Sequence, residues 1–386
     1  MKTRILIFIT AFLFALNLLI PVTVLSSGPP PAKKWKGEGE VIEFESIPVI
    51  TVKDFLNGKV PEKAQTIWGT LNFPANAPDK NVPVVVVLHG GGGIHNAEER
   101  WLGILNSMGL ATFMVDSNYP RRKCKKTFKK AIPNCNDVHR GITRIVDARR
   151  ALEFLSKHPR IDPDRIGCLG ISLGARGCLY VNVKRFQNMW GIPGLDFAAS
   201  VPIYPPCNVI WKDDDEITDT PIRIHVGELD TYFPVDSCVN YVDRLKAKGK
   251  DVDIKIYPEA HHGFDAKMIF KKQSGGTSTK MKIKDHNDGR CYYEENQELT
   301  VDQIGEKSVA VITQIGLNDW LNTATDKEKN KLYKWHKKGV KFGWTISQLR
   351  FDESCVSKST TMAYNEKAAV EAEKLVREFV TTTLLK

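Results

Sequence analysis

The chain has 386 residues and a formal net charge of +10, because 55 lysine and arginine residues outnumber 45 aspartate and glutamate residues. Hydrophobic residues make up 42% of it and charged residues 26%, which excludes a disordered tail, a collagen-like repeat and a polytopic membrane protein. The length suffices for one large domain with insertions or for two domains. Eight cysteines are too few to build a fold on disulfides, but they are enough for several bridges.

Residues 1–26 have the pattern of a secretory signal peptide. Lys2 and Arg4 precede a long apolar run that ends in small residues. A retained membrane anchor is the alternative interpretation. We expect a linker rich in glycine and proline over 27–40 and an exported domain over 41–386, periplasmic or secreted after cleavage. In such an oxidising compartment disulfides can form.

Short apolar runs alternate with amphipathic segments along the middle of the chain. This alternation predicts βαβ units and a mostly parallel sheet. The run 82–88 is nearly all valine, as expected of a strand that is buried on both faces. The other predicted strands cover 111–115, 166–169, 198–203, 222–226 and 252–257. The predicted helices cover 98–108, 138–157 and 234–248.

The sequence pattern changes near the C-terminus. Residues 267–360 hold lysine-rich polar stretches and few strand patterns, whereas 363–385 have the spacing of one amphipathic helix. We interpret the first stretch as a long irregular insertion ahead of the last helix of the same domain. A small separate C-terminal domain is the alternative.

The strongest catalytic motif has the pattern G-x-S-x-G and reads Gly170-Ile171-Ser172-Leu173-Gly174. It follows a predicted strand and precedes a predicted helix, where the nucleophile elbow of a serine hydrolase lies. Glycines permit the sharp turn that exposes the serine hydroxyl, and the helix N-terminus favours negative charge beside it. Turns that are only structural also carry this motif, but its position favours Ser172 as a nucleophile.

A serine nucleophile needs a base to accept its proton, and the base needs an acid to orient it. In an α/β-hydrolase both follow the nucleophile, the acid first. Of the histidines after Ser172, His225 lies inside a predicted strand, where a core role is expected, and two others lie in the irregular stretch. His261 and His262 remain, in the loop after strand 252–257, and both are candidates for the base.

Asp230 is the favoured acid, because it lies in the loop that follows strand 222–226. Glu228 is its rival in the same loop. Asp236 is a weaker candidate, because it falls in the first turn of the next predicted helix, where an acidic side chain stabilises the helix dipole.

Two backbone N–H groups are expected to stabilise the oxyanion of acyl transfer. Leu173 supplies one of them, because it follows the nucleophile. The other is expected from the loop after strand 82–88, where His89 precedes the four glycines 90–93. This run lacks the lysine and the hydroxyl of a P-loop, so nucleotide binding is not expected.

The chain resembles the dienelactone hydrolase family of α/β-hydrolases, which places its catalytic histidine just before a Gly-Phe or Ala-Phe pair. The matching stretch reads Tyr257-Pro258-Glu259-Ala260-His261-His262-Gly263-Phe264. The resemblance runs from Val41 to the C-terminus, and its other segments are 115–117, 120–121, 147–152 and 164–166. It implies an α/β-hydrolase fold with a mostly parallel central sheet, helices on both faces and no large cap. It also assigns the base to His262 and the second oxyanion donor to Gly91.

Two departures from the family pattern affect the expected substrate. Founding members use a cysteine nucleophile and keep an acidic residue beside the oxyanion loop, whereas this chain has Ser172 and Gly90 at the matching places. Both changes favour a general ester or lactone hydrolase over one specific for dienelactones. The long insertion, with Cys291 and Cys355, resembles exported branches of the family.

Positions along the predicted fold suggest how the cysteines pair. Cys207 and Cys238 follow neighbouring strands, and the other two pairs would close loops. The expected disulfides are Cys207–Cys238, Cys124–Cys135 and Cys291–Cys355. Cys168 and Cys178 flank the elbow and are expected to be buried free thiols. No C-x-x-C pair is present, so no metal site is expected.

Three basic residues are candidates for contact with the substrate. They are His89, Arg121 and Arg176, which lie close in sequence to predicted active-site loops, although a structural salt bridge is an alternative for both arginines. Arg121 also begins a basic run that reaches Lys130. We interpret this run as a solvated loop that makes at most weak contact with an anionic envelope, and nucleic-acid binding is not expected.

These patterns predict an exported serine hydrolase that cleaves an ester or lactone of a small-to-medium substrate. Ser172 would form an acyl-enzyme, with His262 as base and Asp230 as its acid. No cofactor is expected, and the protein is expected to be a monomer or dimer. The alternatives are a serine peptidase of the prolyl-oligopeptidase type and a non-catalytic α/β-hydrolase-fold protein that binds an anionic polymer.

Overall fold

The computed structural model describes two long parts of the chain and four short strands between them. The first part is residues 39–265 without 49, 51, 122–136, 208, 231–232 and 234, the second part is 362–386, and the short strands cover 282–283, 292–295, 298–301 and 356–357. The predicted signal peptide and most of the predicted linker and insertion lie outside the described residues.

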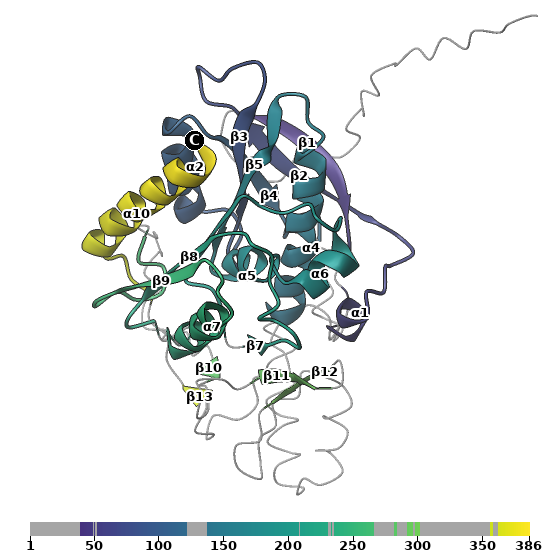
Figure 1. Ribbon diagram of the computed structural model, residues 1–386, viewed down its shortest axis with the longest axis vertical. Coiled ribbons are helices and arrows are strands. Elements are labelled where there is room, and N and C mark those ends of the chain that lie inside the picture. Colours follow the sequence, from purple (N-terminus) through teal and green to yellow (C-terminus); the bar gives the residue numbers. More distant parts are fainter. Residues whose placement is uncertain are drawn as a thin grey trace, which may run out of the picture. The chain divides into compact units, whose positions relative to one another are not determined.

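Eight strands form the central sheet, in the order β1-β2-β4-β3-β5-β6-β8-β9 (Figure 1). Their bounds are β1 (Glu40–Ser46), β2 (Gln65–Asn72), β3 (Val82–Leu88), β4 (Ala111–Asp116), β5 (Ile161–Ile171), β6 (Ala199–Ile203), β8 (Ile222–Gly227) and β9 (Val252–Tyr257). β2 pairs antiparallel with both β1 and β4, and every other neighbouring pair in this sheet is parallel. The parallel strands therefore end at one common edge.

Two smaller sheets involve the short strands. β7 (Val209–Ile210) pairs parallel with β11 (Tyr292–Glu295), which pairs antiparallel with β12 (Glu298–Val301). β10 (Lys282–Ile283) pairs antiparallel with β13 (Val356–Ser357).

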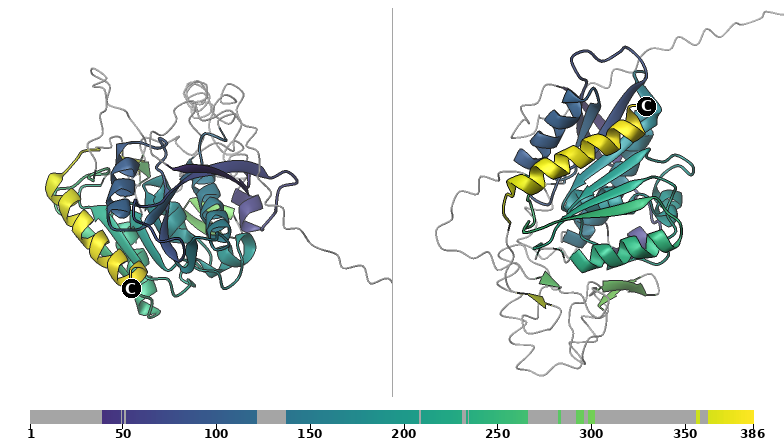
Figure 2. Two further views of the ribbon diagram at one scale, coloured as in Figure 1. Left: turned by 90° about the horizontal axis from the view of Figure 1, so that it is seen from above. Right: turned by 60° about the vertical axis from the view of Figure 1, so that its left-hand side comes forward.

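Helices cover both faces of the central sheet, as Figures 1 and 2 show. Their bounds are α1 (Val52–Leu56), α2 (Asn96–Ser107), α4 (Asp137–Leu155), α5 (Leu173–Tyr180), α6 (Lys184–Trp190), α7 (Val235–Ala247) and α10 (Glu366–Leu384). α2 and α10 pack on one face, and α4, α5 and α7 pack on the other. None of the helices in the described parts of the chain is both long enough and apolar enough to span a bilayer.

The valine-rich strand β3 joins the cores of the two faces. Val85 and Val87 pack in the cluster that contains α2 and α10, whereas Val84 and Val86 pack in a cluster with α4. All seven residues of β3 are buried, which explains why its sequence lacks polar alternation. Full burial of one such valine contributes roughly 1.5–3 kcal/mol, so β3 stabilises the cores on both faces of the sheet.

The six predicted strands correspond to β3, β4, β5, β6, β8 and β9. β5 begins earlier than predicted, because Ile161 pairs with Val82 ahead of a register shift in the ladder with β3. The predicted helices correspond to α2, α4, α7 and α10, with ends that differ by a few residues.

The last helix returns to the loop that follows β9. Ala363 N donates to the His262 carbonyl oxygen at 3.2 Å, and Asn365 N donates to the Phe264 carbonyl oxygen at 3.0 Å. Asn365 also caps α10, since its side chain accepts a hydrogen bond from Ala368 N. The start of the last helix is thus held to the loop that carries His262.

Candidate active site

The elbow around Ser172 joins β5 to α5 in a sharp left-handed turn. Ser172 has a φ of +54°, a conformation that L-residues rarely adopt outside constrained sites. Glycines on both sides make the turn possible: a Cβ on Gly170 would lie 2.4 Å from the Gly174 carbonyl oxygen. A Cβ on Gly174 would lie 2.1 Å from the Leu88 carbonyl oxygen, so α5 begins tightly against the end of β3. The serine hydroxyl is thereby placed at the carboxyl edge of the sheet.

Ser172, His262 and Asp230 are linked by two hydrogen bonds. His262 Nε2 lies 2.9 Å from Ser172 Oγ, and His262 Nδ1 lies 2.7 Å from Asp230 Oδ2. The second carboxylate oxygen of Asp230 accepts a hydrogen bond from Phe233 N at 2.9 Å. His262 and Asp230 are both buried, which excludes bulk water from the pair. This is the geometry in which an imidazole can accept a proton from a serine hydroxyl.

Backbone hydrogen bonds hold the loops that carry Asp230 and His262 together. Leu229 N donates to the Ala260 carbonyl oxygen at 2.8 Å, next to Gly227, where a Cβ would lie 2.4 Å from the same oxygen. A glycine at that position therefore allows the two loops to approach this closely. The acid and the base are fixed relative to each other mainly by main-chain contacts.

The rival candidates lie elsewhere. Glu228 is exposed, and its carboxylate accepts a hydrogen bond from Glu259 N at 3.0 Å. Asp236 lies in the first turn of α7. His261 Nδ1 lies 3.0 Å from the Leu229 carbonyl oxygen. Among the described contacts, His262 binds Ser172 and Asp230 binds His262. The described contacts of Glu228 and His261 are with other groups.

Two aromatic rings enclose the His262 imidazole. The Tyr204 ring centroid lies 4.4 Å from that of His262, and the Phe233 centroid lies 5.3 Å from it in an edge-on arrangement. Tyr204 OH donates to Asp265 Oδ1 at 2.8 Å, and Trp101 Nε1 donates to Asp265 Oδ2 at 2.6 Å. Burial, together with the charge of Asp265, raises the pKa of Tyr204 well above its ordinary value. Tyr204 is therefore a neutral donor that is held against the imidazole.

The glycine loop after β3 lies against the elbow. A Cβ on Gly90 would lie 3.6 Å from Ser172 Cβ, and a Cβ on Gly91 would lie 3.9 Å from a Leu173 methyl group. Gly90 N donates to Glu98 Oε1 at 2.9 Å, so this amide already has an acceptor. Gly91 follows it directly in the same loop. Leu173 N is the first amide of α5, where an N–H has no acceptor within its own helix.

Glu98 is a buried acid beside the glycine loop that follows β3. Its Oε2 accepts a hydrogen bond from His95 N at 2.9 Å, which also anchors the start of α2. Burial raises the pKa of Glu98, although the hydrogen bond from the Gly90 N–H lowers it in part. Gly90 itself has no acidic side chain, but the carboxylate of Glu98 lies within 3.8 Å of where its Cβ would be.

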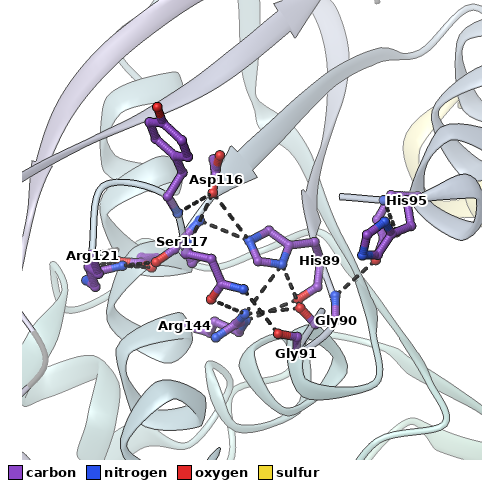
Figure 3. A network of polar contacts seen from close by, with 12 residues as sticks. His89, Gly90, Gly91, His95, Asp116, Ser117, Arg121 and Arg144 are labelled. Atoms are coloured by element: carbon purple, nitrogen blue, oxygen red, sulfur yellow. Dashed lines mark hydrogen bonds and ion pairs between the residues drawn. The ribbon is translucent and has the colours of Figure 1, made fainter. Parts of the chain in front are cut away.

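His89 and Arg144 form a buried network under the same loop (Figure 3). Ser117 N donates to His89 Nε2 at 3.2 Å, so the proton of the neutral ring is on Nδ1, which lies 2.7 Å from the Gly90 carbonyl oxygen. Arg144 donates to the carbonyl oxygens of His89 and Gly90 at 3.1 and 3.2 Å. Its Nη2 also lies 3.4 Å from His89 Nδ1, which is a contact between two donors in this tautomer. His89 is buried, and its ring binds the backbone of the glycine loop.

Comparison with known proteins assigns the chain to a family. A model of the dienelactone hydrolase family matches residues 68–278, more than half of the chain. The chain belongs to the dienelactone hydrolase family. The family places it among carboxylic ester hydrolases, and the predicted α/β-hydrolase fold is confirmed by the eight-stranded central sheet and its helices.

Individual relatives of this dienelactone hydrolase family member are distant. A probable 2-oxo-3-(5-oxofuran-2-ylidene)propanoate lactonase from Bradyrhizobium sp. is 23% identical over 219 residues, which cover 54% of this chain and 86% of the lactonase. The acylamino-acid-releasing enzyme of Rattus norvegicus is 24% identical over 277 residues, which cover 61% of this chain but only 37% of that enzyme. Among solved structures, a thermophilic esterase from Thermogutta terrifontis with propionate bound is 16% identical with a TM-score of 0.39, over 53% of this chain and 82% of that one.

The predicted basic contacts of this family member are buried in the protein. Arg121 pairs with Asp147 through two hydrogen bonds, at 2.7 and 2.8 Å, which is the salt bridge that the sequence left as an alternative. Arg176 lies on α5, and its side chain packs where a Cβ on Gly141 of α4 would be, only 2.7 Å from Arg176 Cδ. Both arginines thus lie between elements of the fold.

Two disulfides lie within the described residues. Cys207 bonds to Cys238, a pair expected from their strands, and Cys168 bonds to Cys178. The expectation of two free thiols beside the elbow is therefore wrong: the strand before the turn and the helix after it bring Cys168 and Cys178 within 5.7 Å at Cα. The pairs Cys124–Cys135 and Cys291–Cys355 lie outside the described residues. No cluster of ligand residues that could hold a metal ion occurs in the described part of the chain.

Five residues that support the candidate site were not predicted from the sequence. They are Glu98, Arg144, Tyr204, Phe233 and Asp265. A signal was present for Glu98, because a glutamate three residues into a helix often reaches back to the amide before it. Asp265 directly follows the His-His-Gly-Phe stretch and lies in the same loop as the base. Arg144 and Tyr204 carry no such local pattern, since their roles depend on elements distant in the sequence.

Proposed function

We propose that this protein is an exported serine hydrolase that cleaves an ester or lactone of a small-to-medium substrate. The observation that carries the proposal is the position of the His262 imidazole, within hydrogen-bond distance of both Ser172 Oγ and Asp230 Oδ2. Family membership supports the ester hydrolase class, and the lactonase relative supports a lactone as one form of substrate.

In the proposed mechanism the proton moves from Ser172 to His262. Asp230 accepts a hydrogen bond from Nδ1–H, so Nε2 is left without a proton and accepts that of the serine hydroxyl as Oγ attacks the carbonyl carbon. The imidazolium then gives the proton to the leaving alcohol. Water attacks the acyl-enzyme by the same route in reverse, and the carboxylic acid leaves Ser172.

The developing oxyanion is assigned to the backbone amides of Gly91 and Leu173. Support comes from the position of the glycine loop against the elbow and from the use of the Gly90 amide by Glu98. Removal of one such donor typically costs about 10²–10³ in kcat, so these two amides carry a large part of the expected rate.

The relative from Rattus norvegicus favours a second candidate. Its name describes release of an acylated amino acid, and it is 24% identical to the matched part of this chain. A serine peptidase would use the same triad on an amide, so the two candidates differ in the leaving group and not in the residues that we assign.

Export is also proposed. The basic and apolar start of the chain supports it, and so do the two disulfides, because such bonds persist in oxidising compartments. N-terminal sequencing of the mature protein, together with fractionation of the producing cells, tests it. We expect a new N-terminus near residue 27, and an intact Met1 in the cytosolic fraction would contradict the proposal.

A panel of substrates and variants tests the catalytic proposal. The full chain is incubated with a fluorophosphonate probe, short-chain p-nitrophenyl esters, a γ-lactone and N-acetyl-alanine p-nitroanilide. We expect labelling and ester or lactone turnover in the wild type, neither in Ser172→Ala, and loss of turnover in His262→Ala. His261→Ala is the matched control and should keep activity.

The outcomes separate the candidates. Faster turnover of the anilide than of any ester would favour the peptidase. A folded wild type without labelling or turnover would contradict catalysis and favour a non-catalytic binding protein. An inactive His261→Ala beside an active His262→Ala would move the base to the neighbouring histidine.

A further inference from the structure

The carbonyl groups of the oxyanion loop are held by two side chains. Arg144, on α4, donates from Nε to the His89 carbonyl oxygen at 3.1 Å and from Nη2 to that of Gly90 at 3.2 Å. The same Nη2 donates to Asn118 Oδ1 at 3.1 Å, and Asn118 Nδ2 donates to the Gly91 carbonyl oxygen at 3.2 Å. Three consecutive carbonyls are thus fixed by a buried guanidinium and by the amide that it orients (Figure 3).

The direction of these carbonyls sets the direction of the Gly91 N–H. In a trans peptide the C=O and the following N–H point in opposite directions. Because the Gly90 carbonyl oxygen points toward Arg144, the Gly91 N–H points away from it. The Gly90 amide on the other side donates to Glu98, so the backbone of Gly90 is held from both ends. A run of glycines has no side chains of its own to restrict it in this way.

The same contacts strengthen the Gly91 N–H as a donor. The Gly90 carbonyl oxygen accepts hydrogen bonds from Arg144, from His89 Nδ1 at 2.7 Å and from Gly93 N at 3.3 Å. A carbonyl that accepts several bonds, one of them from a cation, draws electron density from its own peptide nitrogen. The guanidinium therefore polarises the Gly91 N–H through a single peptide group.

We propose that Arg144 is a positioning residue for the oxyanion hole, which orients and polarises the Gly90–Gly91 peptide so that the Gly91 N–H meets the tetrahedral oxyanion. This inference rests on the proposed serine hydrolase function and extends it to a residue that does not touch the substrate. Arg144 is expected to act on kcat rather than on substrate binding, because the Gly91 amide is needed most when negative charge develops on the carbonyl oxygen in the transition state.

The variant Arg144→Met tests this role in the full chain. We expect kcat for a p-nitrophenyl ester to fall by at least tenfold and by up to about 10²–10³-fold, the loss that follows removal of an oxyanion donor, with KM nearly unchanged. A trifluoromethyl ketone, which forms a tetrahedral adduct with the serine, should bind more weakly by a similar factor. Inhibition by the carboxylate product should not change.

Arg149→Met is the matched control. Arg149 lies on the same helix, is as buried as Arg144, and donates to the carbonyl oxygens of Val181 and Leu195, outside the triad and the oxyanion loop. It should lose stability but keep its kcat. Arg144→Lys keeps the charge but loses the planar guanidinium, whose Nε and Nη2 reach two carbonyl oxygens at once. We therefore expect an intermediate loss of kcat.

Several outcomes would overturn the inference. They are an unchanged kcat in folded Arg144→Met, a loss confined to KM, or an equal loss of kcat in Arg149→Met. If Arg144→Met does not fold, Arg144→Lys decides, and a kcat equal to that of the wild type rejects the role. Failure of the proposed function is a different result, because the wild type would then show neither fluorophosphonate labelling nor turnover.

Discussion

The buried ion pair between Arg121 and Asp147 predicts a large and specific loss of stability when it is broken. The Arg121 guanidinium bonds to both carboxylate oxygens of Asp147, and it also donates to the carbonyl oxygens of Ile47 and Ser117, each at 2.9 Å. Asp147 is fully buried and also accepts a hydrogen bond from Ser46 Oγ. The variant Arg121→Met leaves this carboxylate without its cation and two carbonyls without a donor.

Breaking such a pair on one side costs about 3–5 kcal/mol, a large part of the roughly 5–15 kcal/mol that stabilises a typical domain. Removing both charges costs less, because neither is left buried alone. We therefore expect Arg121→Met to lower the free energy of unfolding by about 3–5 kcal/mol and the double variant Arg121→Met/Asp147→Leu to recover a substantial part of it.

Urea denaturation followed by circular dichroism measures the loss of stability, and ester hydrolysis on the folded fraction measures function. KM should stay close to that of the wild type, because the guanidinium lies inside the fold. A loss of less than about 1 kcal/mol in Arg121→Met, the scale of an exposed ion pair, or a rise in KM at unchanged stability would contradict this prediction. The second result would return Arg121 to the substrate site.

Three further predictions concern stability. Gly174→Ala should yield little folded protein, because its methyl group would lie 2.1 Å from the Leu88 carbonyl oxygen. Replacing Cys207 and Cys238 with alanine should cost about 3–4 kcal/mol by urea denaturation, as expected for a loop of 31 residues. Burial lowers the pKa of His225 from 6.5 to about 4. Between these two pH values the imidazole of the unfolded chain binds a proton and that of the folded chain does not. Stability should therefore fall by about 3 kcal/mol as the pH drops from 6.5 to 4, and His225→Gln should lack this part of the loss.

Matched variants make these predictions decisive. Gly103→Ala is the control for the elbow glycine, because a Cβ there meets nothing within 4 Å, and it should be neutral or slightly stabilising. His95→Gln, at an exposed histidine, is the control for the acid transition. Normal folding of Gly174→Ala, no loss of stability in the cysteine variant, or equal acid sensitivity in His225→Gln and the wild type would each contradict the corresponding prediction.

The sequence predicted the parallel strands of the central sheet and missed β1 and β2, which pair antiparallel at one end of it. β3 and β9 were predicted at their observed bounds, because an uninterrupted apolar run or a strong alternation marks them. β1 was missed, because Glu40, Glu43 and Glu45 interrupt its apolar residues. It lies at the edge of the sheet and pairs only with β2 there, so its outer positions carry charge at little cost.

The candidate site could be predicted where its residues belong to a local motif, and it could not where its contacts depend on packing. Ser172 lies in a motif whose glycines are required by the turn itself, and the contact with His262, 90 residues away, follows from the order of the strands. Tyr204 and Arg144 follow no pattern that their neighbours in sequence reveal. Their roles come from the ends of β6 and the inner face of α4, which reach the site only once the sheet has formed.

The glycine loop after β3 is held by two ionisable side chains, one from each face of the sheet. Glu98 comes from α2 on one face of the sheet and binds the Gly90 N–H, whereas Arg144 comes from α4 on the other face and binds the carbonyls of His89 and Gly90. A glycine loop gains close approach to the elbow but loses rigidity, and ordering it costs conformational entropy. Ionic groups make stronger hydrogen bonds to peptides than neutral ones do. Glu98 and Arg144 therefore connect the loop to the helices on both faces of the sheet. Their hydrogen bonds restrict a glycine backbone that has no side chains to restrict it.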